Sequence, residues 1–351
     1  MSNLDQQHPI ITTNYVVRTQ QISDLFDSLD EWLNNRCPGA IIYGMQRAGK
    51  SRGIRYQREA LLSSRPKLFT FHFPCNTYRL PSEGAFFSDL LKAAGHMIWS
   101  TGSPTMKRYR LVEFLADKAI SSGEGMIVLF ADDAQRLREI QYNWLMDIHN
   151  ELQLRNIHLI AILVGQEELL QQRDTFFKMK QKQLIGRFMV HERQFYGIRS
   201  LRELQQCLTA YDDTTEYPVG SGNSFTSHFF PEAWKRGWRL RKEAEMIWGA
   251  IRECAQEIGK ARVGEIPMQY ICRIVENILK YYGPLSSSTS NLTHLNFKDA
   301  VARSGLIDSF RFECRLPVFR TGRGQTFMTD PSVFQRPFGA GMSRCGRFCK
   351  G

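Results

Sequence analysis

The segment from Gly44 to Ser51 has the residue types and spacing of a loop that binds phosphate groups. It reads Gly-Met-Gln-Arg-Ala-Gly-Lys-Ser, which matches the pattern G-x-x-x-x-G-K-[S/T]. The backbone N–H groups of such a turn surround phosphate oxygens, and the helix that follows points its positive end at the same charge. Lys50 is then expected to reach the β- and γ-phosphates of ATP, and Ser51 to ligate Mg²⁺. The other residues predicted to contact the nucleotide are Gln46, Arg47, Ala48, Gly49 and Arg52.

Two adjacent acids, Asp132 and Asp133, follow the apolar run of residues 126–131. Such a run predicts a buried strand of a parallel sheet, with the acids at its carboxyl end beside the phosphate loop. There Asp132 can hold Mg²⁺, directly or through water, and Asp133 can orient or deprotonate the attacking water. The alternatives are acids that cap the next helix, and a glycine-rich turn that no longer holds a nucleotide.

The elements that must position these residues alternate between strands and helices. The phosphate loop lies between a short apolar run and a segment of helical spacing. Further strands are predicted over residues 68–73, 126–131, 158–164 and 188–191, and helices over residues 86–99, 111–120 and 137–152. This alternation predicts an α/β fold with a parallel sheet sandwiched by helices.

The chain divides into four predicted parts. Residues 1–38 form an N-terminal extension, 39–197 the α/β nucleotide-binding domain, 198–284 a small helical lid and 285–351 a flexible basic tail. The tail holds ten Lys and Arg residues against four acids and lacks helical or strand periodicity. Phenylalanines spaced through it suit a peptide that docks on a partner: Phe310, Phe312, Phe319, Phe327, Phe334, Phe338 and Phe348.

The charge of the chain predicts a polyanionic partner. Its 351 residues carry a net charge of +11, which favours double-stranded DNA, although some surfaces are simply basic. Basic residues in predicted loops are the candidates for phosphate contacts, namely Arg79, Lys107 and Arg108. Such contacts need only positive charge and donors, so they would be independent of DNA sequence. No apolar run is long enough for a membrane span and the N-terminus has no signal-peptide core, so we expect a cytoplasmic protein without membrane contact.

The order of these motifs resembles that of the AAA+ ATPases. In that family a polar residue after the next strand is the first sensor, and Gln166 matches its place. The family's arginine finger has a setting like Gly186-Arg187-Phe188, and it acts on the nucleotide of a neighbouring subunit. The second sensor is an arginine at the start of a lid helix, for which the resemblance offers Arg239 or Arg241.

Within the AAA+ proteins the chain is most similar to the TniB/TnsC transposition regulators. The similarity extends over about residues 12–282 and includes residues 14–19, 38–44, 49–52 and 163–169. It implies a regulator that forms a ring or helical filament of identical subunits with ATP on DNA. It also implies recruitment of transposase subunits, a target-selector protein of the TniQ/TnsD type and a location at the bacterial nucleoid.

Asp133 departs from the family pattern, which has Glu at this place. Its side chain is one methylene shorter, so we expect its carboxylate to lie farther from the attacking water and ATP hydrolysis to be slow. Asp133 thus leaves open a scaffold that binds ATP with little hydrolysis. Two further alternatives are independent of Asp133: a helicase or clamp loader with the same fold, and a small-molecule kinase, since phosphate loops also occur in kinases.

Overall fold

The structure is a computed structural model that describes residues 6–283, 292–315, 319–320 and 326–327. The chain divides into two units, residues 1–307 and residues 308–351. Among the described residues, no helix combines the length and the apolar character that crossing a bilayer requires.

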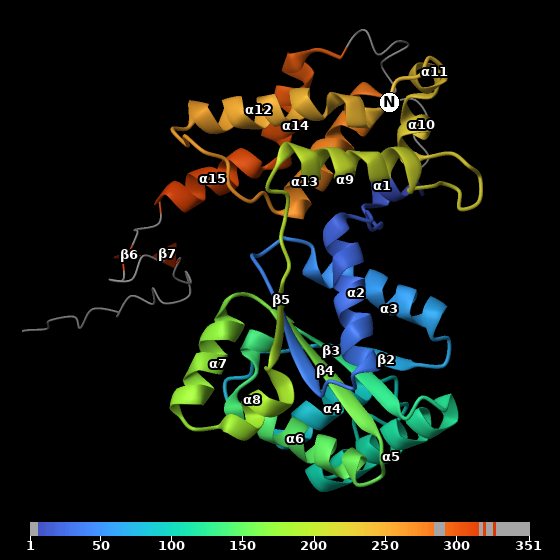
Figure 1. Ribbon diagram of the computed structural model, residues 1–351, viewed down its shortest axis with the longest axis vertical. Helices are drawn as coiled ribbons and strands as arrows, with labels where there is room; N and C mark the ends of the chain where they lie inside the picture. The colour runs from blue at the N-terminus through green and yellow to red at the C-terminus, as the bar shows by residue number, and fades with distance from the viewer. Residues whose placement is uncertain (1–5, 284–291, 316–318, 321–325, 328–351) are drawn as a thin grey trace, which may run out of the picture. The chain divides into compact units, whose positions relative to one another are not determined.

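A five-stranded sheet lies at the centre of the α/β part of the first unit (Figure 1). Its strands pair in the order β2-β3-β4-β1-β5, and all pairs are parallel. The strands are β1 (Gly39–Tyr43), β2 (Phe69–Pro74), β3 (Met126–Asp132), β4 (His158–Gly165) and β5 (His191–Gln194). Because parallel strands all end at the same edge, the loops after β1, β3 and β4 meet there. The predicted α/β fold class is confirmed.

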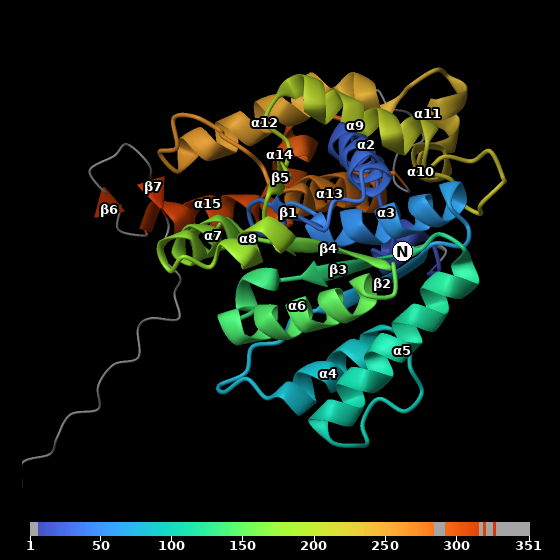
Figure 2. The same ribbon diagram turned by 60° about the horizontal axis from the view of Figure 1, so that its bottom comes forward.

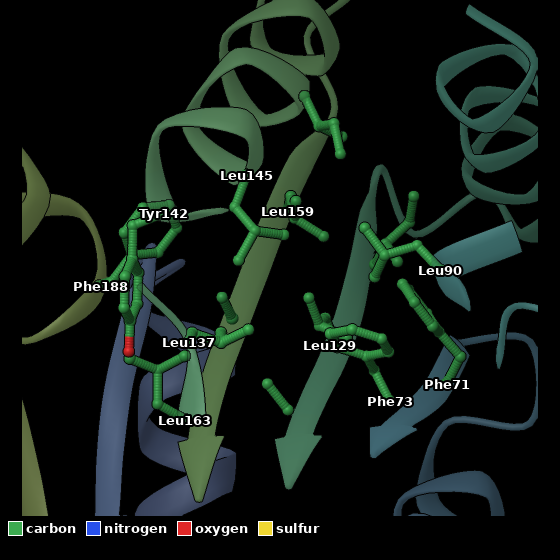
Figure 3. Packing of buried hydrophobic residues seen from close by; sticks show 14 of the residues in the cluster. Phe71, Phe73, Leu90, Leu129, Leu137, Tyr142, Leu145, Leu159, Leu163 and Phe188 are labelled. Carbon is green, nitrogen blue, oxygen red and sulfur yellow. The ribbon is translucent and has the colours of Figure 1, made fainter. Parts of the chain in front are cut away.

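Helices cover both faces of this sheet (Figure 2). One face packs against α2 (Gln20–Asn34) and α3 (Lys50–Ser64), and the other against α4 (Glu83–Ala93), α5 (Pro104–Ser122) and α6 (Glu139–Gln153). Successive residues of β1, β3 and β4 are buried on opposite faces, as Leu129 and Phe130 of β3 illustrate. Figure 3 shows the packing of Leu129, Leu159 and Leu163 against the helices of the second face.

Two predicted elements of the α/β part were wrong in their bounds. The helix expected over residues 86–99 ends at Ala93, because Gly95 follows in the left-handed conformation with φ 84°. The strand expected over residues 188–191 begins only at His191, and Phe188 instead ends α8 (Lys182–Phe188), which follows α7 (Glu168–Lys178). A short buried apolar run does not distinguish a helix from a strand.

A group of helices follows β5 and forms the predicted lid. It comprises α9 (Leu201–Asp213), α10 (Phe225–Phe229), α11 (Pro231–Lys235), η2 (Leu240–Glu243), α12 (Ala244–Glu257), α13 (Met268–Asn277) and the π-helical turn η3 (Ile278–Tyr282). Two shorter elements lie outside the lid, α1 (Pro9–Thr12) and η1 (Ala134–Arg136). An antiparallel bridge between Ile198 and Ile266 closes the connection between the sheet and the lid.

The prediction of a flexible tail from residue 285 was wrong for its first part. Helix α14 (His294–Ser304) packs against α12 and α13, and its Phe297, Ala300 and Val301 are fully buried. These three residues have helical spacing, but polar neighbours conceal the pattern in the sequence. The chain continues through α15 (Leu306–Arg315) to a short antiparallel pair of β6 (Phe319–Arg320) and β7 (Thr326–Phe327). Phe334, Phe338 and Phe348 lie outside the described residues.

Candidate nucleotide-binding site

The phosphate loop leaves the end of β1 and leads into α3 (Figure 1). A Cβ atom on Gly44 would lie 2.1 Å from the carbonyl oxygen of Phe195, so only glycine fits at the start of the loop. Gly49 caps α3 with φ 104°, a conformation that favours glycine. Glycine is therefore required at the two positions for different reasons: a close backbone contact at Gly44 and a positive φ at Gly49. Both glycines shape the turn in front of the N-terminus of α3.

Lys50 extends back into this turn. Its ammonium group donates hydrogen bonds to the carbonyl oxygens of Gly44 and Met45, both at 2.7 Å. Burial lowers the pKa of Lys50, while the carboxylates of Asp132 and Asp133 act in the opposite direction. The Lys50 ammonium group is therefore largely buried, at the position where the motif predicts a phosphate group.

Ser51 and Asp132 face each other across the end of β3. The Ser51 side chain is hydrogen bonded to the Asp132 carboxylate, whose Oδ2 also lies 3.3 Å from His72 Nε2. Burial alone would raise the pKa of Asp132, but the hydrogen bonds of His72 and Ser51 and the charge of His72 outweigh it, so the pKa is lowered. A hydroxyl and an ionised carboxylate are ligands that suit Mg²⁺.

His72 is a site residue that the sequence interpretation missed. It lies in β2 beside β3, and only its polar side chain within an apolar strand distinguishes it in the sequence. Among the described residues no group of three or more His, Cys, Asp or Glu side chains could hold a metal ion. Mg²⁺ at Ser51 and Asp132 would therefore complete its coordination with phosphate and water oxygens, as this ion usually does.

Asp133 and Gln166 are brought to the same edge of the sheet. Asp133 adopts φ 56°, and its carboxylate accepts a hydrogen bond from Gln135 at 3.3 Å and forms an ion pair with Arg136 at 3.0 Å. The side-chain Oε1 of Gln135 in turn accepts a hydrogen bond from the backbone N–H of Gln166 at 3.4 Å. Since β4 lies between β1 and β3, Gln166 follows it next to both the phosphate loop and the acids. This is the place expected for the first sensor.

A cavity of about 420 Å³ opens beside the phosphate loop. It is lined by the segment from Tyr15 to Ile22, by Gly49 and Arg52, by the connection after β5 and by Met268. Its volume falls within the usual range for small-molecule sites, and it adjoins the N-terminal turn of α3. A nucleoside attached to phosphates in the loop would fit there. The sequence interpretation treated the N-terminal segment only as an extension and missed this contribution.

The start of α13 is the part of the lid that reaches the phosphate loop. The backbone N–H of Gln269 donates to the carbonyl oxygen of Arg47 at 3.1 Å, and the Arg47 guanidinium donates to the Tyr270 hydroxyl. The position of a Cβ atom on Gly49 lies 3.5 Å from the Met268 side chain. No sequence motif marks these lid residues, which follow a proline at the start of an ordinary amphipathic helix.

The structure does not bring Arg239 or Arg241 to the phosphate loop. The Arg239 guanidinium lies over the Trp234 ring at 3.4 Å, and it donates to the carbonyl oxygens of Trp234 and Trp238. Arg241 pairs with Asp213. Both arginines thus bind other residues of the lid and stabilise its internal packing. The expectation of a second sensor here is corrected, because the lid helix that starts at the loop is α13 and its first turn contains no arginine.

Arg187 lies at the opposite edge of the sheet. A Cβ atom on Gly39, the first residue of β1, would lie 2.7 Å from the Arg187 carbonyl oxygen. The phosphate loop begins at the other end of that strand, roughly 13 Å further along. Arg187 therefore cannot serve the nucleotide site of its own chain, and only a site in another subunit suits the role that the resemblance implies.

The three candidates for DNA contact differ in their surroundings. Arg79 is exposed in the loop after β2, and Lys107 lies in the first turn of α5. The side chain of neither residue makes a hydrogen bond or an ion pair with another described residue, and only the backbone N–H of Lys107 donates a bond, to the carbonyl oxygen of Ser103 at 3.0 Å. Arg108 is paired across to α6, at 3.5 Å from Asp147 and 3.9 Å from Glu151.

A protein-family model matches part of this chain. Residues 34–172 match the family model of an AAA domain. The matched segment contains the phosphate loop, the acid pair and Gln166, and the AAA+ fold is thereby confirmed. No curated protein matches the chain in sequence. The closer resemblance to TniB/TnsC regulators stays a prediction.

Several solved structures have a similar fold. A Walker-type ATPase from Pyrococcus abyssi has 15% identity and a TM-score of 0.49, covering 83% of this chain and 74% of that chain. The ORC2 protein of Aeropyrum pernix, solved as ADPNP–ADP complexes, has 15% identity and a TM-score of 0.47, with 84% and 71% covered. Domain III of the replication initiation protein DnaA from Thermotoga maritima has 13% identity and a TM-score of 0.43, with 85% and 97% covered. At such values no ligand, partner or residue role is transferred to this chain.

Proposed function

We propose that this protein is an ATP-dependent, DNA-binding regulator of transposition. The observation that carries the ATP part is the meeting of Lys50, Ser51 and Asp132 beside a cavity of about 420 Å³. Lys50 binds the β- and γ-phosphates, and Ser51 and Asp132 would hold Mg²⁺, which would supply further positive charge to the phosphate oxygens. Asp133 prepares the attacking water, and Gln166 contacts the γ-phosphate.

We further propose that ATP lies between two identical subunits. The amino edge of one subunit, with Arg187, would face the carboxyl edge of the next. Such a head-to-tail interface uses two different surfaces of one chain, so it generates either a closed ring or an open helical filament. ATP hydrolysis would remove the γ-phosphate from the interface and so drive disassembly.

Duplex DNA is the proposed polyanionic partner. Residues 90–112, which include the loop between α4 and α5, contain four Lys and Arg residues and no acid. Lys107 lies in this stretch, and the loop that carries Arg79 leads to Gly84 at the start of α4, which adjoins Pro104 at the start of α5. Contacts from such residues to backbone phosphates give binding without sequence preference and with strong salt dependence.

The assignment to transposition rests on the resemblance to TniB/TnsC regulators. Under this proposal, the assembly on DNA recruits or activates transposase subunits and meets a target selector of the TniQ/TnsD type at the bacterial nucleoid. A scaffold with little hydrolysis is the second candidate, since Asp133 is short and both Gln135 and Arg136 bind its carboxylate.

Electron microscopy of the full chain with duplex DNA tests the proposed assembly. With a non-hydrolysable ATP analogue we expect rings or filaments on DNA of any sequence, and with ADP we expect none. Assembly that ignores the nucleotide would contradict the proposal. Release of phosphate during disassembly separates the regulator with hydrolysis from the scaffold.

A pull-down with transposase subunits tests recruitment. Because α14 packs in the lid, the deletion is placed after α15, over residues 316–351. We expect this deletion to leave ATP-dependent DNA binding intact and to abolish recruitment, as should Ala at the phenylalanines of the deleted segment. Weakened DNA binding together with normal recruitment by the Phe→Ala protein would show that the tail is purely electrostatic.

A further inference from the structure

The Arg187 guanidinium is held by three side chains of α6. It donates to His149 Nδ1 at 3.2 Å and to Gln153 Oε1 at 2.9 Å from Nη1, and to Asn150 Oδ1 at 3.0 Å from Nη2. The three acceptors lie within the last five residues of α6, on one side of this helix. We call His149, Asn150 and Gln153 the α6 cradle.

The backbone that carries Arg187 is fixed independently of this cradle. Phe188, the next residue, is fully buried, and its ring packs against Tyr142 of α6 with centroids 6.0 Å apart (Figure 3). Leu184 of α8 is also fully buried. The hydrogen bonds of Arg187 are therefore not needed to attach α8 to α6, because buried apolar side chains already do so.

The cradle uses only part of the donor capacity of the guanidinium. Arginine has five N–H donors in a planar fork. Both hydrogens of Nη1 and one of Nη2 are used by the cradle, which leaves Nε–H and one Nη2–H without a partner among the described residues. These two donors are the ones that bind two oxygens of a phosphate side by side.

The cradle also leaves the charge of Arg187 uncompensated. Its three acceptors are neutral, since burial and the charge of Arg187 lower the pKa of His149 to about 4. Other arginines near this edge are paired with carboxylates, such as Arg173 with Glu192 at 2.6 Å and Arg155 with Glu113 at 2.5 Å. A carboxylate partner would compete with a phosphate for the guanidinium, and the cradle avoids that competition.

We propose that His149, Asn150 and Gln153 are positioning residues that aim the open edge of Arg187 at a phosphate of the nucleotide bound to a second copy of this chain. The inference rests on the proposed trans role of Arg187 and adds the residues that prepare it. A guanidinium fixed before assembly loses less conformational entropy when it binds the phosphate, so more of the binding energy remains for the reaction.

Mixed assemblies test this inference on duplex DNA. Asp133→Asn subunits retain Arg187 but are inactive at their own site, and Arg187→Ala subunits retain an intact site but supply no guanidinium. Each variant alone should have little ATPase activity, and their mixture should regain it. Asn150→Ala with Gln153→Ala in the Asp133→Asn subunit should lower the regained kcat by about 10- to 100-fold with KM unchanged. The same pair in the Arg187→Ala subunit should have no effect.

A second variant separates positioning from attachment of α8. Gln153→Glu in the Asp133→Asn subunit keeps an acceptor for Arg187, so a merely structural role would be preserved and the thermal midpoint maintained. Under the inference this variant lowers the regained kcat, because the new carboxylate competes with the phosphate. If the mixture never regains activity, the trans role itself fails, and the inference with it. If the mixture is active but the cradle variants retain full kcat, or lose it equally in either subunit, the inference alone is overturned.

Discussion

The two edges of the parallel sheet differ in how their central cations are bound. At the carboxyl edge, Lys50 is bonded to the carbonyl oxygens of its own loop, and carboxylates lie near it. At the amino edge, Arg187 is bonded to three neutral acceptors of α6. Within the part of the chain that the structure describes, no carboxylate pairs with Arg187. Under the proposed function, the first edge binds a nucleotide with residues of its own chain, whereas the second presents a cation outward.

Under the proposed function, this difference means that each chain carries two unlike halves of one catalytic site. In that proposal the carboxyl edge supplies the loop, the metal ligands and the water-activating acid, and the amino edge supplies a guanidinium about one strand length away. A monomer can therefore bind nucleotide and yet lack the last cation. The following predictions test this comparison.

Lys50→Ala has the largest expected effect. Removing the ammonium leaves the β- and γ-phosphates without their buried cation, so ATP binding should be lost, and hydrolysis and assembly with it. Isothermal titration calorimetry measures the affinity, with Lys67→Ala as a control at an exposed lysine. An unchanged affinity for ATP would refute the interpretation of the carboxyl edge.

Arg187→Ala should affect only the assembled protein. ATP affinity of the monomer should be unchanged, while kcat on DNA falls by about 10³-fold, the scale of an arginine finger. Steady-state kinetics at several protein concentrations give kcat and KM, and Arg155→Ala is the control for a carboxylate-paired arginine. A loss of ATP binding in the monomer would place Arg187 at its own site and remove the difference between the edges.

Asp133→Glu should accelerate hydrolysis. The extra methylene extends the carboxylate toward the attacking water, and we expect kcat to rise about tenfold, within the range of general base catalysis. Single-turnover phosphate release in preformed assemblies measures this step. A rate that does not change, or falls, would show that the length of Asp133 does not limit hydrolysis at the carboxyl edge.

Tyr15→Phe tests how strongly the N-terminal segment, which lines the cavity at the carboxyl edge, is attached to the lid. The Tyr15 hydroxyl donates to Glu276 Oε1 at 2.9 Å and lies 3.0 Å from the Tyr211 hydroxyl, and all three groups are buried. Its removal should lower the free energy of unfolding by about 1–3 kcal/mol, because the buried Glu276 loses a donor. Urea denaturation measures the change, with Tyr281→Phe as an exposed control. Equal stability of the two variants would contradict the expectation.

Lys107→Ala should have the smallest effect of the five. We expect DNA affinity to fall evenly across sequences and the slope of log affinity against log salt to decrease by about 1. Arg108→Ala should change the slope less, because Asp147 and Glu151 already partly compensate its charge. Fluorescence anisotropy at several salt concentrations checks both values. A larger change of the slope in Arg108→Ala than in Lys107→Ala would show that Arg108, and not Lys107, makes the stronger contact with DNA phosphates.

The sequence by itself determined the parts of the site whose residues are contiguous. A strand, a glycine-rich turn and a helix follow one another within a few residues, so the pattern around Lys50 fixes its own geometry. Asp132 and Asp133 follow a strand whose apolar run is unambiguous, and the parallel sheet then brings them to the same edge. Gln166 could be placed for the same reason, as the residue after the neighbouring strand.

Only the tertiary structure decided the contacts between distant segments. Arg47 and Tyr270 are 223 residues apart, and no local pattern indicates that α13 rather than η2 starts at the phosphate loop. The cradle of Arg187 joins a helix to residues more than 30 positions earlier, and its neutral acceptors have no motif. The periodicity of apolar residues predicts which face of a helix or strand is buried, but it does not predict the distance between two elements. That distance is set by the packing of the whole core, and with it the lid contacts, the cavity and the orientation of Arg187.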